Sequence, residues 1–325
     1  MNTSSMNTSA MKKILVIGST VADIIIELDR LPVTAEDVHV KTQSMSLGGC
    51  AHNVAAMIRH FDVPFTLFSP VGTGLYGDFV RKELTAKGMG SPIPAPNMAN
   101  GCCYCFVEAS GERTFVVDHG AEYLFEKEWF DLLDPSKYSA AYICGLEIEE
   151  KTGSTIVDFL ERSGLPVFFA PGPRLAKIDD ALMQRIFALH PVIHLNRDEI
   201  CSYTGCPDVE TAAKRMYAKT ENIIIITLGA DGACFFPSDE TDGTGSGMVC
   251  VPPVPAAEIA DTIGAGDGHC GAVMACLSMG LSLSEALAAA NAVSAKIVSV
   301  KGALLRQEEF RQALDHLSFY PRFGL

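Results

Sequence analysis

Short apolar runs alternate with helix-length amphipathic segments along most of the 325-residue chain. Runs such as IIIIT at 223–227 are apolar without interruption, which is typical of strands buried on both faces of a parallel sheet. Strands are expected at 13–18, 65–70, 140–144, 166–170, 191–195 and 222–227. Helices are expected at 50–61, 76–87, 150–163, 179–189, 197–204, 209–219, 265–279, 284–299 and 307–317. The alternation predicts an α/β fold, a doubly wound and mostly parallel sheet flanked by helices, with ligands bound beyond the carboxyl ends of the strands.

Two regions depart from this alternation. Residues 20–46 and 100–117 have half-polar, strand-like patterns and no helix of their own. We therefore expect them to form a small antiparallel sheet that projects from the main sheet as a lid. The polar residues 1–11 predict a disordered leader, and residues 12–325 are expected to form a single domain.

Composition narrows the range of partners. The chain is 48% hydrophobic and 20% charged, with a net charge of -14. An acidic surface repels the phosphates of nucleic acids and anionic lipids, so no nucleic acid and no membrane is expected as a partner. Nor does the chain contain a charge-free apolar stretch of the roughly 18 residues that a membrane-spanning helix needs. These features predict a soluble, cytoplasmic protein that acts on a small molecule.

The chain has eleven cysteines. Three of them, Cys102, Cys103 and Cys105, crowd one strand-like stretch, where alternate side chains face opposite ways and cannot surround one metal ion. We interpret the cysteines as small apolar core residues in a reducing cytosol, and expect neither disulfides nor a metal site.

The segment with the most specific chemical pattern is DTIGAGD at 261–267, which leads into a long helix of small apolar residues. Gly264, Ala265 and Gly266 leave the backbone N–H groups of the helix N-terminus uncovered, and such groups bind anions. Asp267 could then accept a proton from a hydroxyl while the amides hold a phosphoryl group. The alternative is an aspartate that only stabilises the helix dipole in the first turn.

This heptad resembles the C-terminal signature of the PfkB (ribokinase-like) family of carbohydrate kinases. GGCAHN at 48–53 resembles the other family signature, a Gly-Gly turn that opens a helix. Asp23 follows the first strand as the sugar-binding aspartate of the family does, and NRDE at 196–199 matches N-x-x-E. TLGADG at 227–232 matches the nucleotide turn T-x-G-x-x-G. The motifs keep the family order over nearly the whole chain after Met11, so the resemblance implies a ribokinase-like fold.

The resemblance also implies a role for each motif. Asp267 is the expected general base, and the transferred phosphoryl group is expected on the backbone of Gly264, Ala265 and Gly266. The residues expected to bind substrate hydroxyls are Asp23, Gly48, Gly49 and Asn53. Those expected to bind ATP are Asn196, Thr227, Gly229, Gly232 and Asn291. Asn196 and Glu199 are expected to orient the water shell of Mg²⁺, and Asn196 also suits a helix N-cap.

A second glycine motif invites a different interpretation. GTGLYG at 72–77 matches the G-x-G-x-x-G of dinucleotide-binding proteins. It does not follow the first strand, and no acidic residue between Glu83 and Glu108 is available for a ribose, so no dinucleotide site is expected. The family commonly carries an acidic residue where Gly74 stands, so one substrate contact is missing here.

The sequence therefore predicts an ATP- and Mg²⁺-dependent kinase that phosphorylates a hydroxyl of a small, uncharged sugar, with a homodimer formed through the lid. A nucleoside such as pseudouridine is the alternative acceptor, and a non-catalytic sugar-binding sensor is the alternative from another class. Three residues keep two interpretations. His269 is either a packed polar ring or a catalytic helper, and Arg113 and Arg174 are either substrate anchors or structural.

Overall fold

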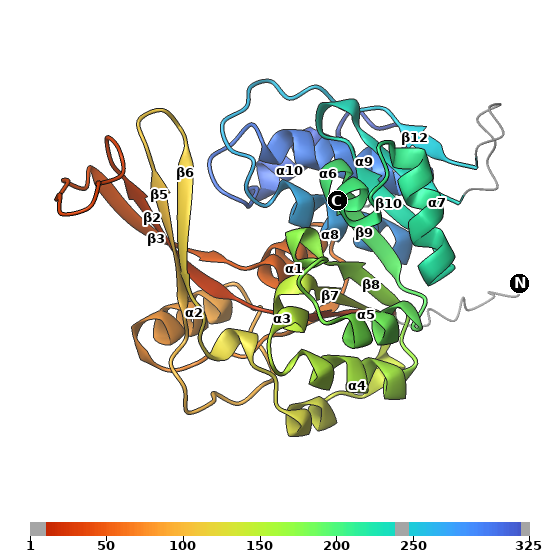
Figure 1. Ribbon diagram of the computed structural model, residues 1–325, viewed down its shortest axis with the longest axis horizontal. Helices are drawn as coiled ribbons and strands as arrows, with labels where there is room; N and C mark the ends of the chain where they lie inside the picture. Colours follow the sequence, from red (N-terminus) through yellow and green to blue (C-terminus); the bar gives the residue numbers. More distant parts are fainter. Residues whose placement is uncertain (1–10, 238–246, 320–325) are drawn as a thin grey trace, which may run out of the picture.

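The computed structural model describes residues 11–237 and 247–319. Its main sheet has eight strands in the order β12-β11-β10-β9-β8-β7-β1-β4 (Figure 1). In chain order these strands are β1 (Lys13–Ile17), β4 (Phe65–Phe68), β7 (Tyr138–Cys144), β8 (Val167–Ala170), β9 (Val192–Asn196), β10 (Ile224–Thr227), β11 (Ala233–Phe236) and β12 (Val249–Val251). In the order of the sheet, β4, β1, β7, β8, β9 and β10 run parallel to one another. β11 and β12 are added antiparallel at one edge. The predicted mostly parallel sheet is confirmed.

Successive side chains of the central strands enter two separate cores, one on each face of the sheet. In β1, for example, Ile14 and Val16 belong to the first core, whereas Leu15 and Ile17 belong to the second. All four are at most 1% exposed. This explains the uninterrupted apolar runs in the sequence, because a strand covered on both faces needs apolar residues at every position.

Helices cover both faces. The first core is closed by α1 (Cys50–His60), α2 (Gly74–Ala86), α8 (Ala265–Ser278), α9 (Leu283–Ile297) and α10 (Gln307–Leu314). The second core is closed by α3 (Gly145–Glu149), α4 (Gly153–Ser163), α5 (Asp180–Phe187), α6 (Arg197–Thr204) and α7 (Val209–Thr220). Short 3₁₀ turns lie at η1 (Ala121–Tyr123), η2 (Lys127–Leu132), η3 (Pro135–Lys137), η4 (Gly172–Arg174) and η5 (Gly229–Asp231). The helices predicted from periodicity are all present.

A second sheet of four strands projects from the main body (Figure 1). It consists of β2 (Val21–Glu27), β3 (Thr42–Gly48), β5 (Cys102–Val107) and β6 (Arg113–Asp118), in the order β3-β2-β5-β6. This sheet is the predicted lid. The prediction that it is antiparallel is wrong for its central pair, because β2 and β5 run parallel. Both strands leave the main body at the same end of the lid, and each then turns back through a hairpin.

Two of the cysteines are bonded to each other. Cys234 on β11 and Cys250 on β12 are direct cross-strand partners and form a disulfide. The prediction that every cysteine is a reduced core residue is therefore wrong for this pair. Their separation of 16 residues carries no local signal, since only the antiparallel pairing of β11 with β12 brings the two sulfurs together. The other nine cysteines are free thiols.

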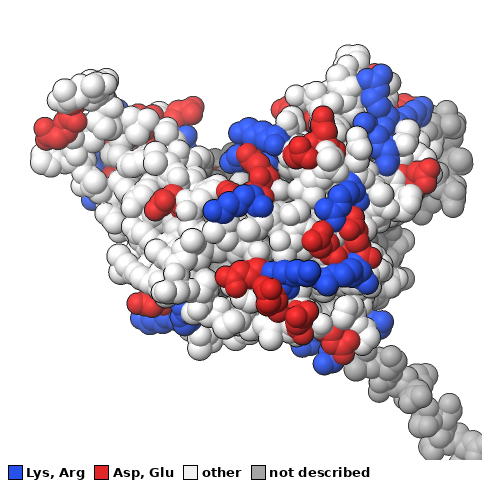
Figure 2. All heavy atoms as spheres, turned by 60° about the horizontal axis from the view of Figure 1, so that its bottom comes forward, with Lys and Arg blue, Asp and Glu red and all other residues white. Residues whose placement is uncertain are grey.

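The remaining sequence predictions concern the leader, the membrane and charge. Residues 1–10 of the predicted leader lie outside the described residues. No helix in the described part of the chain is long and apolar enough to cross a bilayer. Acidic and basic side chains are interspersed on the face shown in Figure 2.

Candidate active site

The loop 261–267 ends at the start of α8, as predicted. Gly264 is the N-cap residue and has a left-handed backbone with φ of 74°. A Cβ added to Gly264 would lie 2.4 Å from the Cβ of Ala303, so only glycine fits there. A Cβ added to Gly266 would meet no atom within 4 Å. The first turn of α8 is therefore accessible at Gly266, which is exposed. The free N–H groups of an accessible helix N-terminus suit an anion.

Asp267 lies in this first turn and is held from α1. The Asn53 side chain donates from Nδ2 to Asp267 Oδ2 at 2.9 Å, and the Cys50 thiol also hydrogen-bonds to the carboxylate. Burial, with a smaller contribution from the nearby charge of Glu147, raises the pKa of Asp267 to about 6 in spite of the two hydrogen bonds. A carboxylate that is ionised at neutral pH, yet binds a proton readily, suits a general base.

Asp23 lies on lid strand β2, against the end of β3. A Cβ added to Gly48 would lie 1.9 Å from Asp23 Oδ2, so the carboxylate occupies the space that a side chain at 48 would need. Gly49 has φ of 96°, and a Cβ there would lie 2.5 Å from the carbonyl oxygen of Ser19. Burial raises the pKa of Asp23 to about 6. The residues predicted to bind the acceptor thus gather where the lid meets the N-terminus of α1, which also carries Asn53.

Sequence reasoning missed Glu147, which lies on α3 directly after β7 and is 1% exposed. Its Oε1 accepts a hydrogen bond from the Ser19 N–H at 2.6 Å, and its Oε2 accepts one from the Cys144 thiol at 2.6 Å. Its charge contributes to the raised pKa of Asp267. A carboxylate just beyond a buried parallel strand was a signal that could have found it, because ligands bind at that edge.

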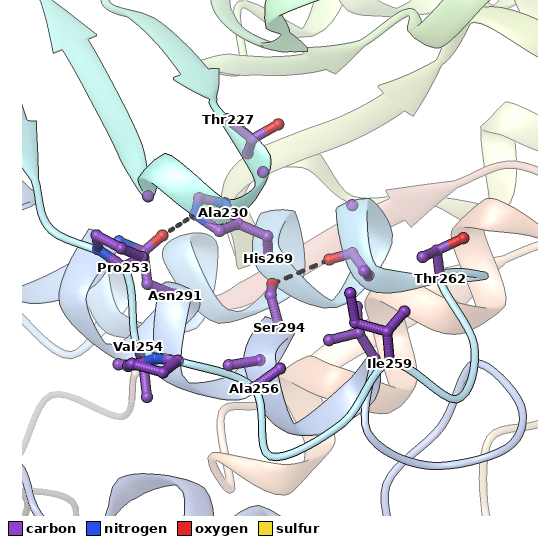
Figure 3. A pocket seen from close by; sticks show the side chains of 17 residues that line it. Thr227, Ala230, Pro253, Val254, Ala256, Ile259, Thr262, His269, Asn291 and Ser294 are labelled. Carbon is purple, nitrogen blue, oxygen red and sulfur yellow. Dashed lines mark hydrogen bonds between the residues drawn. The ribbon is translucent and has the colours of Figure 1, made fainter.

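A mostly apolar cavity of about 550 Å³ adjoins the start of α8 (Figure 3). Four residues predicted to bind the nucleotide line it, namely Thr227, Gly229, Gly232 and Asn291, and so do Ala265 and Gly266 of the predicted anion loop. Much of the remaining wall comes from the segment after β12, with Pro253, Val254, Pro255, Ala256 and Ile259. Apolar walls with a few fixed polar groups are typical of small-molecule sites.

The turn after β10 shapes one side of this cavity. Gly229 and Gly232 have φ of 61° and 91°. A Cβ added to Gly232 would lie 2.3 Å from the carbonyl oxygen of Val251, so glycine is required for β11 to approach β12 here. The predicted T-x-G-x-x-G turn thus has a steric basis in the structure.

Asn196 and Glu199 are bonded to each other at the start of α6. The Glu199 N–H donates to Asn196 Oδ1 at 2.8 Å, and the Asn196 N–H donates to Glu199 Oε2 at 2.9 Å, which is a capping box. Asn196 pairs in register with Thr227 on the neighbouring strand, at the cavity edge. Within residues 11–237 and 247–319, no group of three or more His, Cys, Asp or Glu side chains is arranged to hold a metal ion. The capping role is therefore seen, and the role at Mg²⁺ stays a prediction.

The three residues with two interpretations all have protein partners. Arg113 Nη1 on β6 donates to Asp261 Oδ1 at 2.5 Å, and Arg174 Nη1 donates to Glu149 Oε2 at 3.0 Å. His269 is 2% exposed and hydrogen-bonded on both ring nitrogens. These contacts account for each residue structurally.

The second glycine motif, at 72–77, packs against the start of the lid. A Cβ added to Gly72 would lie 2.5 Å from the Asn100 backbone nitrogen, and one added to Gly77 would lie 2.0 Å from the Gly72 carbonyl oxygen. Tyr76 in the same motif is hydrogen-bonded through its hydroxyl to that of Tyr104 on β5 at 2.9 Å. The glycine spacing therefore has a packing explanation.

The α/β fold thus brings an apolar cavity and a polar site beside the lid together at one helix N-terminus. The chain belongs to the pfkB family of carbohydrate kinases, whose family pattern it matches over residues 11–309. It is therefore an ATP-binding carbohydrate kinase, and the family resemblance inferred from the sequence is confirmed.

Named relatives and solved structures agree. The chain is 32% identical over 296 residues to the uncharacterised sugar kinase YegV of Escherichia coli K12, covering 90% of each protein. It is 25% identical to a ribokinase of Arabidopsis thaliana, covering 94% of this chain and 81% of that protein. The crystal structure of ribokinase from Thermotoga maritima has the same fold, with a TM-score of 0.79 at 22% identity, over 94% of this chain and all of that one.

Proposed function

We propose that this kinase transfers the γ-phosphate of ATP to a hydroxyl of a small, uncharged sugar, with Asp267 as the general base. One observation carries the proposal. The first turn of α8 joins the two halves of the site, since Ala265 and Gly266 line the apolar cavity while Asp267 is hydrogen-bonded to Asn53 on the lid side.

Separate groups of residues bind the acceptor, the transferred phosphoryl group and the adenine. The acceptor lies against Asp23, Gly48, Gly49 and Asn53, and its hydroxyl gives a proton to Asp267 as the oxygen attacks phosphorus. The backbone amides from Gly264 to Gly266 stabilise the charge of the group in transfer. The adenine lies in the cavity, between the turn from Thr227 to Gly232 and the wall that contains Asn291.

Mg²⁺ neutralises phosphate charge when it is bound. Glu199 keeps one carboxylate oxygen outside the capping box, and Asn196 keeps its amide nitrogen. A water bound to Mg²⁺ donates its hydrogens outward, so the remaining Glu199 oxygen suits the water shell of the ion. The Asn196 amide nitrogen is a donor and suits a phosphate oxygen instead. These two groups do not make a set of direct ligands, so we place Asn196 and Glu199 outside the inner coordination sphere.

The ion pairs of two arginines favour an uncharged acceptor. A carboxylate or phosphate on the acceptor would need a cation, ideally a bidentate arginine. Arg113 and Arg174 each have a carboxylate partner already, at 2.5 Å and 3.0 Å. The residues proposed to bind the acceptor instead include a carboxylate, Asp23, and an amide, Asn53, which suit neutral hydroxyls.

The test is a rate comparison at fixed ATP and Mg²⁺ across ribose, fructose, pseudouridine, 2-keto-3-deoxygluconate and fructose 1-phosphate. We expect the highest kcat/KM with a neutral sugar. A highest value with pseudouridine would establish the alternative acceptor class. A highest value with either anionic compound would refute the neutral acceptor and direct attention to Arg113 or Arg174. ADP release with none of a wide panel, despite binding, would favour a sugar sensor.

The proposal includes a cytoplasmic homodimer formed through the lid. Edge strand β6 exposes three consecutive apolar side chains, Phe115, Val116 and Val117, which are 50%, 54% and 44% exposed. An exposed apolar edge strand is a pairing surface. Light scattering should give twice the chain mass of 34.8 kDa, and Phe115→Asp should return the monomer. An unchanged mass in that variant would argue against the lid interface.

A further inference from the structure

Three buried polar side chains form a continuous chain behind the cavity wall. His194 on β9, His269 on α8 and Asn291 on α9 are 5%, 2% and 8% exposed. His194 Nε2 lies 2.8 Å from His269 Nδ1, and His269 Nε2 lies 3.3 Å from Asn291 Oδ1. Figure 3 shows the bond between His269 and Asn291 at the edge of the cavity, which both residues line.

The donor and the acceptor of each hydrogen bond can be assigned by starting from the contacts of the Asn291 amide. Asn291 Nδ2 lies 3.2 Å from the carbonyl oxygen of Val251 and 2.9 Å from that of Pro252. Carbonyl oxygens only accept, so the amide nitrogen must face them and the amide oxygen must face His269. His269 Nε2 therefore carries a proton and donates it to Asn291.

Both histidines are neutral, so the donor and acceptor can also be assigned for the hydrogen bond between His194 and His269. Burial lowers the pKa of His269 to about 4 and lowers that of His194 well below its usual value. With its proton on Nε2, neutral His269 accepts at Nδ1, so His194 Nε2 is the donor. Every hydrogen bond then points the same way, from β9 through α8 and α9 to the segment after β12.

This order fixes what Asn291 can offer to a ligand. Both amide hydrogens are used by the Val251 and Pro252 carbonyls, and the amide oxygen has one lone pair left. The side chain can therefore accept a hydrogen bond from a ligand and cannot donate one. A purine with an amino group at C6 presents a donor, whereas a purine with an oxo group there presents an acceptor.

We propose that the chain from His194 through His269 to Asn291 makes the cavity selective for 6-amino over 6-oxo purine nucleotides. Asn291 is the residue that meets the base. The two histidines are positioning residues that hold its amide together with the Val251 and Pro252 carbonyls. The inference rests on the proposed function, since it takes the cavity to be the nucleotide site.

The experiment compares ATP with ITP, which differ only in the C6 group and its adjacent ring proton. The measured quantity is the ratio of kcat/KM for the two donors, with the best acceptor. We expect wild type to favour ATP by about tenfold or more, because an oxo group would face an acceptor it cannot pair with. In Asn291→Leu the ratio should approach one, mainly through KM for ATP. In His269→Phe it should fall at least about threefold, since the amide is then held only through its nitrogen.

Ser294→Ala is the matched control. Ser294 lines the same cavity from α9, and its hydroxyl donates to the Ala265 carbonyl at 3.1 Å. Its substitution should keep the ATP to ITP ratio within about twofold, whatever happens to kcat. A role limited to folding would lower activity with both nucleotides equally in the His269 and Asn291 variants and leave their ratio unchanged, which would overturn the proposal.

Binding measurements separate this inference from the proposed function. Calorimetry of wild type with ADP and IDP needs no acceptor and no variant. A tenfold preference for ADP without any phosphoryl transfer would support the base selectivity and contradict the proposed reaction. Equal affinity for ADP and IDP in wild type would overturn the selectivity even if transfer were fast.

Discussion

Asp267→Asn should make the protein inactive and more stable at neutral pH. The pKa of Asp267 is raised by burial from its usual 3.8 to about 6. The folded protein therefore binds a proton at this site more tightly than the unfolded chain does. Below about pH 3.8 the carboxyl is protonated in both states and carries no penalty. As pH rises to about 6 the unfolded chain loses the proton first, so the free energy of unfolding falls, and the full penalty is present above about 6.

The magnitude follows from the same values. At about 1.4 kcal/mol per pKa unit, the difference between 3.8 and about 6 amounts to about 3 kcal/mol at pH 7.5. The new amide can still accept the Asn53 hydrogen bond through its oxygen, whereas the bond from Cys50 is weakened, so about 3 kcal/mol is an upper value. For a chain of this size that corresponds to an increase in Tm of about 5 °C. Loss of the general base should lower kcat by about 10²–10⁴-fold.

The assay pairs thermal unfolding at pH 4 and pH 7.5 with steady-state kinetics on the same preparations. Stabilisation should be clear at pH 7.5 and much smaller at pH 4, where the wild-type carboxyl is already protonated in the folded state. Asp131→Asn, at an exposed position on η2, is the control and should change neither Tm nor kcat. The reasoning is refuted if kcat falls less than about tenfold, or if the gain in Tm is the same at both pH values.

Three further predictions test other parts of the site. Gly48→Ala should displace the Asp23 carboxylate, whose Oδ2 would lie 1.9 Å from the new Cβ, and should raise KM for the acceptor without changing ADP affinity. Gly90→Ala is the control, because the new Cβ would meet no atom within 4 Å. Equal losses of affinity for acceptor and ADP in calorimetry would contradict the assignment. Gly266→Val should fold normally, because its side chain enters open space, but should raise KM for ATP at least about tenfold; an unchanged KM would show that the nucleotide does not reach this turn. Thiol titration of the denatured, unreduced chain should count nine cysteines, and eleven after reduction; eleven before reduction would disprove the Cys234–Cys250 bond.

The fold was predictable where local pattern determines structure. The apolar run at 223–227 and the helix of small residues after Asp267 can each be recognised from a few neighbouring residues. The glycine motifs were predicted by resemblance, and not from their physical cause. A side chain at Gly49 would meet the Ser19 carbonyl oxygen and one at Gly232 that of Val251, and both contacts come from distant segments.

What escaped prediction depends on contacts between distant segments. Glu147 meets Ser19 across 128 positions, and Cys234 meets Cys250 only through strand pairing. The parallel arrangement of β2 and β5 likewise depends on where each strand leaves the main body. The site of Asn291 was predicted by resemblance, but its orientation was not, because the Val251 and Pro252 carbonyls that fix it lie about 40 positions away.

The ion pair between Arg113 on the lid and Asp261 in the loop 261–267 affects which acceptors can bind. Burial alone would raise the pKa of Asp261, but hydrogen bonds from Arg113, Ile263 and Gly302 outweigh it and hold the pKa below its usual value. Asp261 is therefore ionised, and its side chain is only 3% exposed, so it depends on Arg113 for its counter-charge. An anionic acceptor that recruited Arg113 would leave this buried carboxylate without a cation, which is costly. The same contact, which ties β6 to the loop before α8, thus disfavours an acidic acceptor, whereas a neutral acceptor would leave it intact.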